Sequence, residues 1–512
     1  MNSPSSSSKE FLIMCLFVVK KRRFTSLFSG VCRFYCQSRK HEFFLSLFGY
    51  RLTVPAFLLL IGLVMGLVLS TSSAQEKASE ELNSLWTRDV GKDWPDFLGL
   101  HRDSKSSEEG ILKDWSGGRL KKRWVFDLSE SYGIGSVAKG RFMQFDRIDD
   151  KEVLICLNAE TGERIWSSSY ATTYRDLYGY NGGPRTSPVI DGARVYTLGV
   201  AGQLRCCRVS DGGLVWSVDT IKKFGVVQNF FGVGSTPIIY KDKVICMVGG
   251  SPAESSSIPP GRLDLVKGNG SAVVAFNKLT GKVLYRFSNE LASYSSPVIT
   301  SEKGVDWGFL FARGGLIGFD PSVGKQRFFY PWRDGSLESV NASNPVIVGN
   351  QVLISETYGP GSSLLSFKEN GMEVVWKDAE RSRIRAMQTH WNTGIHHDGF
   401  FYGSSGRHSN NAELKCVEWK TGVEKWSVPN LTRSSLLYVD GHFLCLTEAG
   451  ILFLFKANPE RFELVTQVRL LDKEGELLLN YPCWAAPVLS HGLLYVRGEK
   501  KLVCLDLIPV KN

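Results

Sequence analysis

The stretch LNAETGERIW, Leu157 to Trp166, places a polar turn closed by Thr-Gly after an apolar run, and a tryptophan follows four residues after the glycine. Glycine adopts positive φ at little cost and Asn and Thr side chains bond nearby amides, so the pattern is typical of a tight β-hairpin. The apolar run and turn recur along the chain as LICLNAETG (154–162), LRCCRVSDG (204–212), VVAFNKLTG (273–281), LIGFDPSVG (316–324), LLSFKENG (364–371), LKCVEWKTG (414–422), LFLFKANPE (452–460) and LVCLDL (502–507). Such self-similarity indicates a repeat architecture.

Two features keep their place in these copies. The third residue is small in seven of the eight copies, namely Cys156, Cys206, Ala275, Gly318, Ser366, Cys416 and Cys504. An aromatic residue follows the turn in six copies, namely Trp166, Trp216, Tyr285, Phe328, Trp376 and Trp426. Large aromatic side chains at equivalent points bury much apolar surface, so we interpret them as structural residues that join neighbouring units.

The units also begin alike, with a small polar residue and proline before a short β-branched run: TSPVIDG (186–192), STPIIYKD (235–242), SSPVI (295–299), SNPVIVGN (343–350) and AAPVLSHG (485–492). Proline at the first position of a strand removes no ladder hydrogen bond. Two further strands and the aromatic segment follow each start. Four short antiparallel strands per unit, repeated radially, are typical of β-propeller blades, and the copies predict an all-β fold of eight blades.

The eighth unit predicts how the ring closes. It begins at Trp484 and ends after its third strand. LKKRWVFDL, Leu120 to Leu128, supplies a fourth strand, and Trp124 supplies the missing aromatic. We therefore predict one blade built from both ends of the propeller, which leaves no open sheet edge. The predicted organisation is a targeting segment (1–74), a lead-in (75–119), the propeller (120–508) and a short tail (509–512).

The net charge of +10 lies mostly in the first 74 residues, which carry nine Lys/Arg against two Glu. The remainder has no basic run, so nucleic-acid binding is not expected. Arg51, the apolar run 54–69 and the small residues before Gln75 together resemble an export signal, or else an uncleaved membrane anchor. The sequence predicts an exported protein of the periplasm or cell envelope that meets the membrane only through this segment.

The strand followed by D/N-x-x-T-G-x-x-x-W resembles the tryptophan-docking motif of quinoprotein-type propellers, the pyrroloquinoline-quinone (PQQ) repeat. LNAETGERIW and VEWKTGVEKW carry the likeness, which covers about residues 93–508. Bacterial PQQ-binding-like repeat proteins similar to outer-membrane assembly factor B are the nearest family. That resemblance implies a non-enzymatic scaffold, while other members are dehydrogenases that hold PQQ and Ca²⁺ on the axis.

Three patterns bear on that choice. Some of these dehydrogenases cap the quinone with a vicinal disulfide, but Cys206 and Cys207 fall in a strand, where adjacent side chains point to opposite faces. His396 and His397 are likewise consecutive strand residues, so they do not predict a metal site. No Ca²⁺ ligand set, catalytic Asp or haem motif is evident in the sequence. We therefore expect no catalytic residue, no metal and no cofactor, with PQQ and Ca²⁺ only under the dehydrogenase alternative.

The fold predicts where a binding site would lie. Residues just before the innermost strands line the axial funnel of a propeller, and here they are Arg185, Tyr294, Asn341, His390, Asn392 and Trp484. Arg185 could hold a carboxylate or phosphate, or cap loop carbonyls. The insertion 251–270 could extend this surface or follow the outside of the molecule.

The function that follows is a non-catalytic binding or scaffold propeller. It would act on protein, peptide or envelope partners, as a monomer or as part of a complex. A PQQ-dependent alcohol-type dehydrogenase is the alternative, and polymer binding through funnel aromatics is a third possibility.

Overall fold

The computed structural model describes residues 44–47, 50–53, 82–369, 371–380 and 382–510. The chain forms two compact units, Met1–Ser79 and Glu80–Asn512. In the first, β1 (Phe44–Leu47) pairs antiparallel with β2 (Tyr50–Thr53). The expected apolar targeting run, 54–69, lies outside the described residues. Within the described parts of the chain, no helix has the length and hydropathy needed to cross a membrane.

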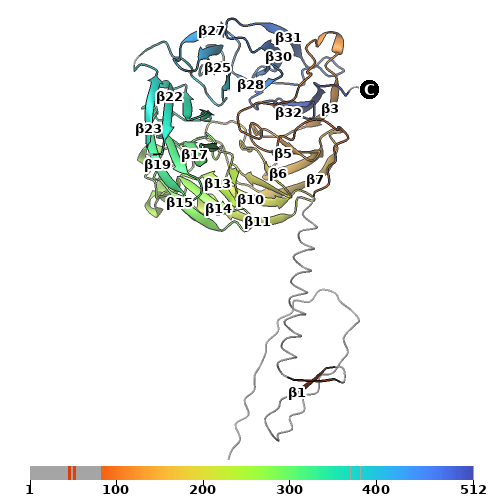
Figure 1. Cartoon of the computed structure of the whole chain (residues 1–512), viewed down its shortest axis with the longest axis vertical. Helices are drawn as coiled ribbons and strands as arrows, with labels where there is room; N and C mark the ends of the chain where they lie inside the picture. Colours follow the sequence, from red (N-terminus) through yellow and green to blue (C-terminus); the bar gives the residue numbers. More distant parts are fainter. Residues whose placement is uncertain (1–43, 48–49, 54–81, 370, 381, 511–512) are drawn as a thin grey trace, which may run out of the picture. The chain divides into compact units, whose positions relative to one another are not determined.

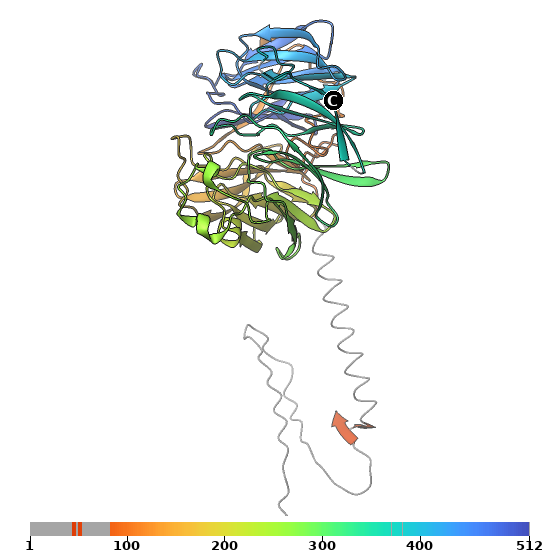
Figure 2. The same ribbon diagram turned by 90° about the vertical axis from the view of Figure 1, so that its left-hand side faces the viewer.

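The second unit contains eight four-stranded antiparallel sheets arranged around a common axis (Figures 1 and 2). The predicted eight-bladed propeller is confirmed. Blades one to four are β4 (Ser136–Ala138), β5 (Arg141–Ile148), β6 (Lys151–Asn158) and β7 (Arg164–Ala171); β8 (Val189–Asp191), β9 (Arg194–Leu198), β10 (Gln203–Arg208) and β11 (Leu214–Asp219); β12 (Ile238–Tyr240), β13 (Lys243–Met247), β14 (Val273–Asn277) and β15 (Val283–Phe287); β16 (Val298–Glu302), β17 (Val305–Phe311), β18 (Gly315–Asp320) and β19 (Lys325–Pro331).

Blades five to seven follow in the same order. They are β20 (Val346–Val348), β21 (Gln351–Glu356), β22 (Gly361–Lys368) and β23 (Gly371–Lys377); β24 (Ile395–His397), β25 (Phe400–Ser405), β26 (Glu413–Glu418) and β27 (Glu424–Pro429); β28 (Ser434–Val439), β29 (His442–Thr447), β30 (Ile451–Lys456) and β31 (Leu464–Arg469). The helical segments described are short: η1 (Ser116–Gly118), α2 (Thr220–Phe224), η2 (Ala253–Ser257) and η3 (Leu263–Leu265).

Blade eight joins the two ends of the ring. Its inner strands are β32 (Val488–Ser490), β33 (Leu493–Arg497) and β34 (Lys501–Asp506), and its outer strand is β3 (Lys122–Asp127). Trp124 lies opposite Cys504 in the antiparallel register, as predicted. In Figure 1, β3 lies in the same blade as β32, although the two strands come from opposite ends of the propeller sequence; β34 is the strand that pairs with β3. The propeller is therefore a closed ring with no unpaired blade edge at its seam.

The docking aromatics join successive blades by a repeated hydrogen bond. An indole N–H donates to a backbone carbonyl in the turn between the third and fourth strands of the next blade, as in Trp124 to Ala159 (3.0 Å), Trp166 to Val209 (2.9 Å) and Trp216 to Lys278 (3.0 Å). Trp376, Trp426 and the Tyr285 hydroxyl donate in the same way, to Trp419, Asn458 and Pro321. The phenyl ring of Phe328 has no N–H or O–H group to donate. Between the same two blades, four and five, the Trp332 indole N–H donates to the Gly361 carbonyl at 3.0 Å.

The small third residue has a direct structural cause. Cys156, Cys206, Cys416 and Cys504 each lie directly across the strand pair from a docking tryptophan. A larger side chain would compete with the indole for this space, and a β-bulge follows the pair in each of the first three cases. In blade five the expected small residue, Ser366, is not at this position. Leu364 pairs with Trp376 instead, because the turn between Lys368 and Gly371 is two residues long and changes the alignment.

The small polar residues before the innermost strands form a belt between blades. The Ser187 N–H donates to the Thr236 hydroxyl (3.0 Å), and the Thr236 N–H donates to the Ser296 hydroxyl (2.9 Å). The Ser296 N–H then donates to the Asn344 side-chain oxygen (2.8 Å), and the Asn344 backbone N–H donates to the Thr393 hydroxyl (3.1 Å). Each link pairs a backbone donor with a side chain of the next blade, which explains why these positions are polar although they are buried.

Hydrophobic cores lie between blades. Cys206 packs with residues of blades two and three, whereas Cys207 packs with residues of blades one and two. The predicted opposite orientation of these adjacent cysteines is confirmed. The eight cysteines in the described part of the chain are all free and buried.

Candidate functional site

A cavity of about 210 Å³ lies at the propeller axis. Its walls come from residues at the starts of the innermost strands and from the loops before them. The rings that line it belong to Tyr132, Tyr180, Phe231, Tyr294, Trp391 and Trp484, together with His390 and Phe97. The cavity therefore lies where the fold predicted a funnel, and its surface is mainly apolar, with many aromatic rings.

The lead-in closes this cavity at one end. Phe97, Leu98 and Ser104 contribute to its lining. The lead-in backbone pairs with blade one at Trp94 and Val137, and with blade seven between Ser106 and Tyr438 (2.9 Å). These contacts fall at the ends of innermost strands, opposite the loops that carry the aromatic residues. The axial cavity therefore opens on one face of the propeller.

Arg102 fastens the lead-in to the axis. Its side chain is 2% exposed, forms an ion pair with Asp96 at 2.6 Å, and donates to the carbonyls of Pro237 and Pro297. Leu98, Arg102 and Ser104 have positive φ angles of 60°, 55° and 56°, which non-glycine residues seldom adopt. Such backbone strain persists only where surrounding contacts hold it.

Arg185 lines the cavity and is bonded within its own loop. It donates to Asp176 at 2.7 Å and to the carbonyls of Gly183 (2.7 Å) and Asn181 (3.1 Å). The sequence allowed two roles for Arg185, the binding of a carboxylate or phosphate ligand and the capping of loop carbonyls. The structure shows the second, because Arg185 donates to the carbonyls of Gly183 and Asn181. The carboxylate that it contacts belongs to this chain, so its charge is compensated within the site.

A second arginine, Arg433, was missed by the sequence analysis. It pairs with the buried Glu448 at 2.7 Å, and its guanidinium lies 4.3 Å from the centre of the Trp391 ring. The Trp484 indole also donates to Glu448 at 3.0 Å. Burial opposes ionisation of Glu448, but the hydrogen bonds from Arg433, Ser409 and Trp484 hold its pKa below the ordinary value. The pair is therefore an internally neutralised unit of the wall.

His390 is held neutral between its neighbours. Burial, and next the nearby Arg433 and Arg407 charges, lower the pKa of His390 to about 3. Its Nδ1 lies 3.3 Å from Arg433 Nη1, and its Nε2 lies 3.3 Å from the Tyr358 hydroxyl. Since Arg433 can only donate, Nδ1 accepts and Nε2 carries the proton. At neutral pH the His390 ring is therefore uncharged.

The two predicted asparagines have structural roles. Asn341 is fully buried outside the cavity lining, and its side-chain amide donates to the carbonyls of Ala312 (2.8 Å) and Trp332 (3.2 Å). Asn392 does line the cavity, but its amide donates to the Ser404 carbonyl at 2.9 Å. The structure therefore brings Arg185, Tyr294, His390, Asn392 and Trp484 together and leaves Asn341 behind the wall.

A signal for the missed residues was present in the sequence. Tyr132, Phe231 and Arg433 precede the innermost strands of blades one, three and seven, just as Arg185 precedes that of blade two. The starts of blades one and seven lack the proline that marks most other blades, which left Tyr132 and Arg433 unpredicted, whereas Phe231 lies seven residues ahead of Ile238, further from its strand than Arg185 is. Tyr180 lies in the loop before β8 and has no counterpart in the repeat, so no pattern indicated it.

Other candidate features lie away from the axis. The His396 ring packs at 4.8 Å against Trp419 and the His397 ring at 4.2 Å against Tyr438, so the two face different blades. The insertion 251–270 packs through Leu263 and Val266 against Leu291 and does not line the cavity.

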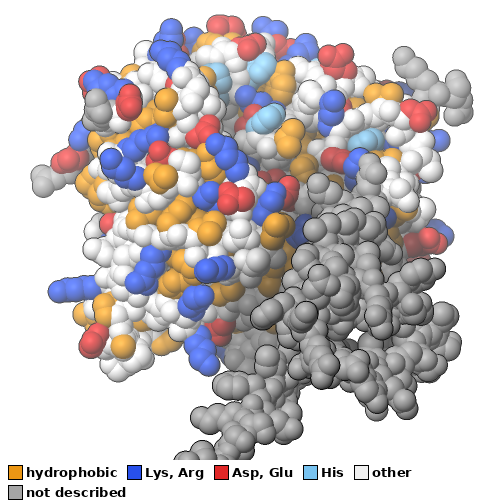
Figure 3. All heavy atoms as spheres, turned by 60° about the horizontal axis from the view of Figure 1, so that its bottom comes forward, with side chains coloured by type: hydrophobic (Ala, Val, Ile, Leu, Met, Phe, Trp, Pro, Cys, Tyr) orange, Lys and Arg blue, Asp and Glu red, His pale blue; other side chains and the backbone are white. Residues whose placement is uncertain are grey.

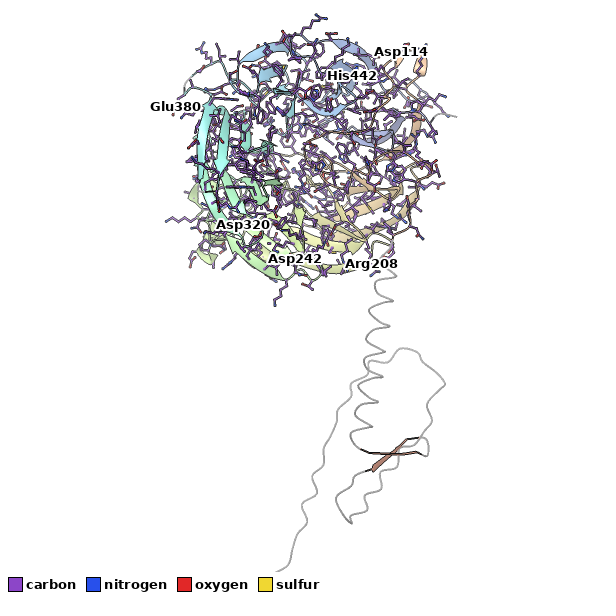
Figure 4. The ribbon with its side chains drawn as sticks, in the orientation of Figure 1. Asp114, Arg208, Asp242, Asp320, Glu380 and His442 are labelled. Carbon is purple, nitrogen blue, oxygen red and sulfur yellow. The ribbon has the colours of Figure 1, made fainter. Side chains whose placement is uncertain are left out.

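Acidic side chains are absent from the described lining of the cavity, which contains no Asp or Glu. Those labelled in Figure 4, Asp114, Asp242, Asp320 and Glu380, lie around the periphery of the disc. Figure 3 shows charged side chains of both signs interspersed with hydrophobic ones on the face that it presents. No group of His, Cys, Asp and Glu with metal-binding geometry occurs among the described residues.

Comparisons with known proteins agree with the fold. A family model described as outer membrane protein assembly factor BamB matches residues 149–428. BamB from Moraxella catarrhalis is 11% identical, with a TM-score of 0.51, over 77% of this chain and 99% of that one. Quinohemoprotein alcohol dehydrogenase from Comamonas testosteroni is 12% identical, with a TM-score of 0.56, over 82% and 81%.

A europium-containing methanol dehydrogenase is 11% identical, with a TM-score of 0.58, over 81% of this chain and 98% of that one. At these identities the solved structures establish a shared fold alone. No curated protein matches the sequence significantly.

Proposed function

The chain belongs to the family of the outer membrane protein assembly factor BamB, and from this membership we propose that it is an exported, non-catalytic binding propeller. Its partner would be a protein or peptide of the cell envelope, engaged by the face on which the axial cavity opens. The family description supports a role in a protein assembly. The charged, apolar and small-residue pattern around residues 51–74 supports export.

The observation that carries this proposal is the chemistry of the axial cavity. It combines aromatic walls with two arginines that are already paired with carboxylates. Aromatic residues and arginine are the side chains that contribute most at protein interfaces. With His390 neutral and no acidic group in the lining, the described cavity offers binding surface without a set of catalytic groups.

The fold is shared with dehydrogenases, so a calcium–quinone pair has to be tested against these residues. Ca²⁺ takes six to eight oxygen ligands, with carboxylates among them. The cavity lining contains no carboxylate, and the nearby Asp176 and Glu448 are each paired with an arginine. Cys206 and Cys207 face different cores and are not placed to cap a ring. The residues present do not fit that cofactor.

Partner capture tests the proposal. We expect the full chain to retain a reproducible protein from envelope extracts, and the rim variants Tyr180→Ala and Tyr481→Ala to lose it. These side chains are 47% and 54% exposed, so their removal should leave the fold intact. Val423→Ala, at a 58% exposed position in an outer turn, is the matched control. Equal capture by all variants would contradict the use of this face.

Enzyme activity tests the alternative. The full chain would be mixed with PQQ and Ca²⁺, and quinone absorbance and dye reduction by alcohols would be followed. We expect neither stoichiometric uptake nor turnover. A stoichiometric complex that oxidises alcohols would replace the binding proposal with the dehydrogenase.

A further inference from the structure

We propose that the axial cavity receives one uncharged aromatic side chain from the partner protein. This inference rests on the proposed binding function and specifies what the partner must present. Four properties of the cavity lead to it, namely its ring geometry, its size, the state of its polar groups and its rim.

The ring geometry comes first, because the wall is a connected set of aromatic contacts. Trp484 lies 4.8 Å from Tyr132 and 5.1 Å from Trp391, measured between ring centroids. On the other side, Phe231 lies 5.5 Å from Tyr294 and 5.7 Å from Tyr180. Aromatic pairs favour tilted or edge contacts at centroid distances of about 4.5–7 Å, and such pairs add roughly 0.5–1.5 kcal/mol beyond burial. A further ring can therefore join this network without rearranging it.

The size of the cavity suits a single ring system. An apolar cavity of about 150 Å³ is large enough to bind benzene. At about 210 Å³, the axial cavity has room for a phenol or indole ring but little beyond it. Drug-sized ligand sites are larger, at about 300–1,000 Å³. A single side chain is thus a better match than an extended cofactor or an oligosaccharide.

Three polar side chains of the wall, Asn392, Thr393 and Arg433, are already bonded within the protein. Asn392 donates to Ser404 at 2.9 Å, and the Thr393 hydroxyl accepts from the Asn344 N–H at 3.1 Å. Arg433 is occupied by Glu448, His390 and the Arg407 carbonyl. A sugar bound here would lose water from its hydroxyls without gaining equivalent partners, which is costly. The site therefore favours an apolar or aromatic group over a carbohydrate.

A negatively charged ligand is disfavoured in the cavity, because both arginines near it are already paired with carboxylates. Arg185 pairs with Asp176 at 2.7 Å, and Arg433 pairs with Glu448 at 2.7 Å, so neither cation awaits an anion. A buried ion without a partner carries a large desolvation cost. The preferred side chain is accordingly tryptophan, tyrosine or phenylalanine.

The exposed tyrosines at the rim of the cavity indicate that the bound aromatic side chain belongs to a protein partner. Tyr178, Tyr180 and Tyr481 are 55%, 47% and 54% exposed. Tyr180 and Tyr481 contact Trp484 at 5.9 and 6.0 Å, and Tyr178 contacts Phe231 at 5.8 Å. An aromatic anchor within a pocket, surrounded by contacts that exclude water, is the usual arrangement of a protein interface hot spot.

Titration calorimetry with small probes tests the inference on the full chain. We expect N-acetyl-L-tryptophanamide and indole to bind at one site, and methyl α-D-glucopyranoside and indole-3-acetate to bind much more weakly. Ala342→Leu places a larger side chain in the cavity wall and should weaken probe binding at least about tenfold, the loss of one anchor contact. Val423→Leu is the matched control and should bind as the wild type does. Ala486→Leu narrows the same cavity and serves if Ala342→Leu does not fold.

The outcomes separate this inference from the proposed function. Absence of probe binding, or stronger binding of the glucoside, would overturn the aromatic anchor even if partner capture through the rim succeeds. Probe binding without any captured protein would instead count against the proposed function. Probe binding that also competes with partner capture supports both.

Discussion

At the scale of single residues, the docking contact explains two sequence features at once. The indole of Trp124 donates to Ala159 in the next blade and covers the turn glycine, Gly162. The glycine provides a left-handed backbone and leaves room for the indole. Several blades repeat this pair of a docking tryptophan and a turn glycine. Each time the turn needs a left-handed backbone and space for the indole, so the same motif recurs in the sequence.

The first prediction separates those two demands. Gly162 has φ of +75°, and a Cβ there would lie 2.7 Å from Trp124. Gly441 has φ of +72°, but a Cβ there would meet nothing within 4 Å. Gly441→Ala should cost about 1 kcal/mol of unfolding free energy through backbone strain alone. Gly162→Ala should cost roughly 1–3 kcal/mol more through the clash. Urea unfolding measures both, and equal losses would contradict a role for the indole.

The second prediction concerns acid stability. The pKa of His390 is about 3 in the folded protein, against 6.5 ordinarily, so the folded state binds fewer protons between these values. Its contribution is complete above pH 6.5 and is lost as the pH falls toward 3. His390→Asn keeps an acceptor for Arg433 but does not titrate. Between pH 7 and pH 4, the wild type should lose roughly 3 kcal/mol more than the variant. Urea unfolding at the two pH values measures the difference. Equal losses of unfolding free energy in the wild type and the variant would contradict this role of His390.

At the scale of elements, the lead-in supplies the contact between blades seven and eight that a docking aromatic supplies elsewhere. Every blade has an outer strand from which the chain continues into the next blade, but β31 of blade seven lacks a docking aromatic. Its place at the seam with blade eight is taken by the lead-in, where the Leu112 N–H donates to the Leu507 carbonyl at 2.8 Å. Leu507 follows Cys504 by three residues, as Ala159 follows Cys156. The same segment thus closes the axis and completes the ring of inter-blade bonds.

The third prediction tests how the lead-in is held. Arg102→Met leaves Asp96 without its ion-pair partner and the Pro237 and Pro297 carbonyls without a donor. We expect a loss of about 2–4 kcal/mol and faster amide exchange across residues 94–106. The double variant Arg102→Met with Asp96→Asn should recover part of the loss, because the buried charge is removed. No recovery would mean that Arg102 acts through packing alone.

The elements differ in how far the sequence predicts them. Blade strands, their order and the closure at Trp124 follow from a repeat whose physical demands recur eight times. The lead-in occurs once, so no internal comparison indicates its course. The site is intermediate: Arg185 and Trp484 could be predicted because a proline marks the innermost strands that they precede, whereas the strand after Arg433 has no such proline. Asn341 was expected at the axis because it precedes an innermost strand, as Arg185 does. Its side chain instead bonds the buried carbonyls of Ala312 and Trp332, and position in the repeat does not determine the direction in which a side chain points.

At the scale of the whole molecule, stability depends on the joint in blade eight. Val125 in β3 lies opposite Val503, and Gln467 in β31 lies opposite Phe453 at the same place in its blade. Proline at either position removes a backbone N–H donor and fixes φ in an outer strand. Val125→Pro also opens the ring, so it should lower the unfolding midpoint more than Gln467→Pro and broaden the transition. Urea unfolding followed by circular dichroism distinguishes them, and identical curves would show that closure adds nothing.

The course of the lead-in has a consequence for how the molecule is oriented. The chain reaches the propeller at Leu82 and crosses the face that bears the β4–β5 and β32–β33 turns, bonding from Leu85 to Lys139 and from Arg88 to His491 on its way. The aromatic opening is on the reverse side. The described chain therefore enters the propeller on the face opposite the opening, so a partner seated on the aromatic rim would leave the entry segment uncovered.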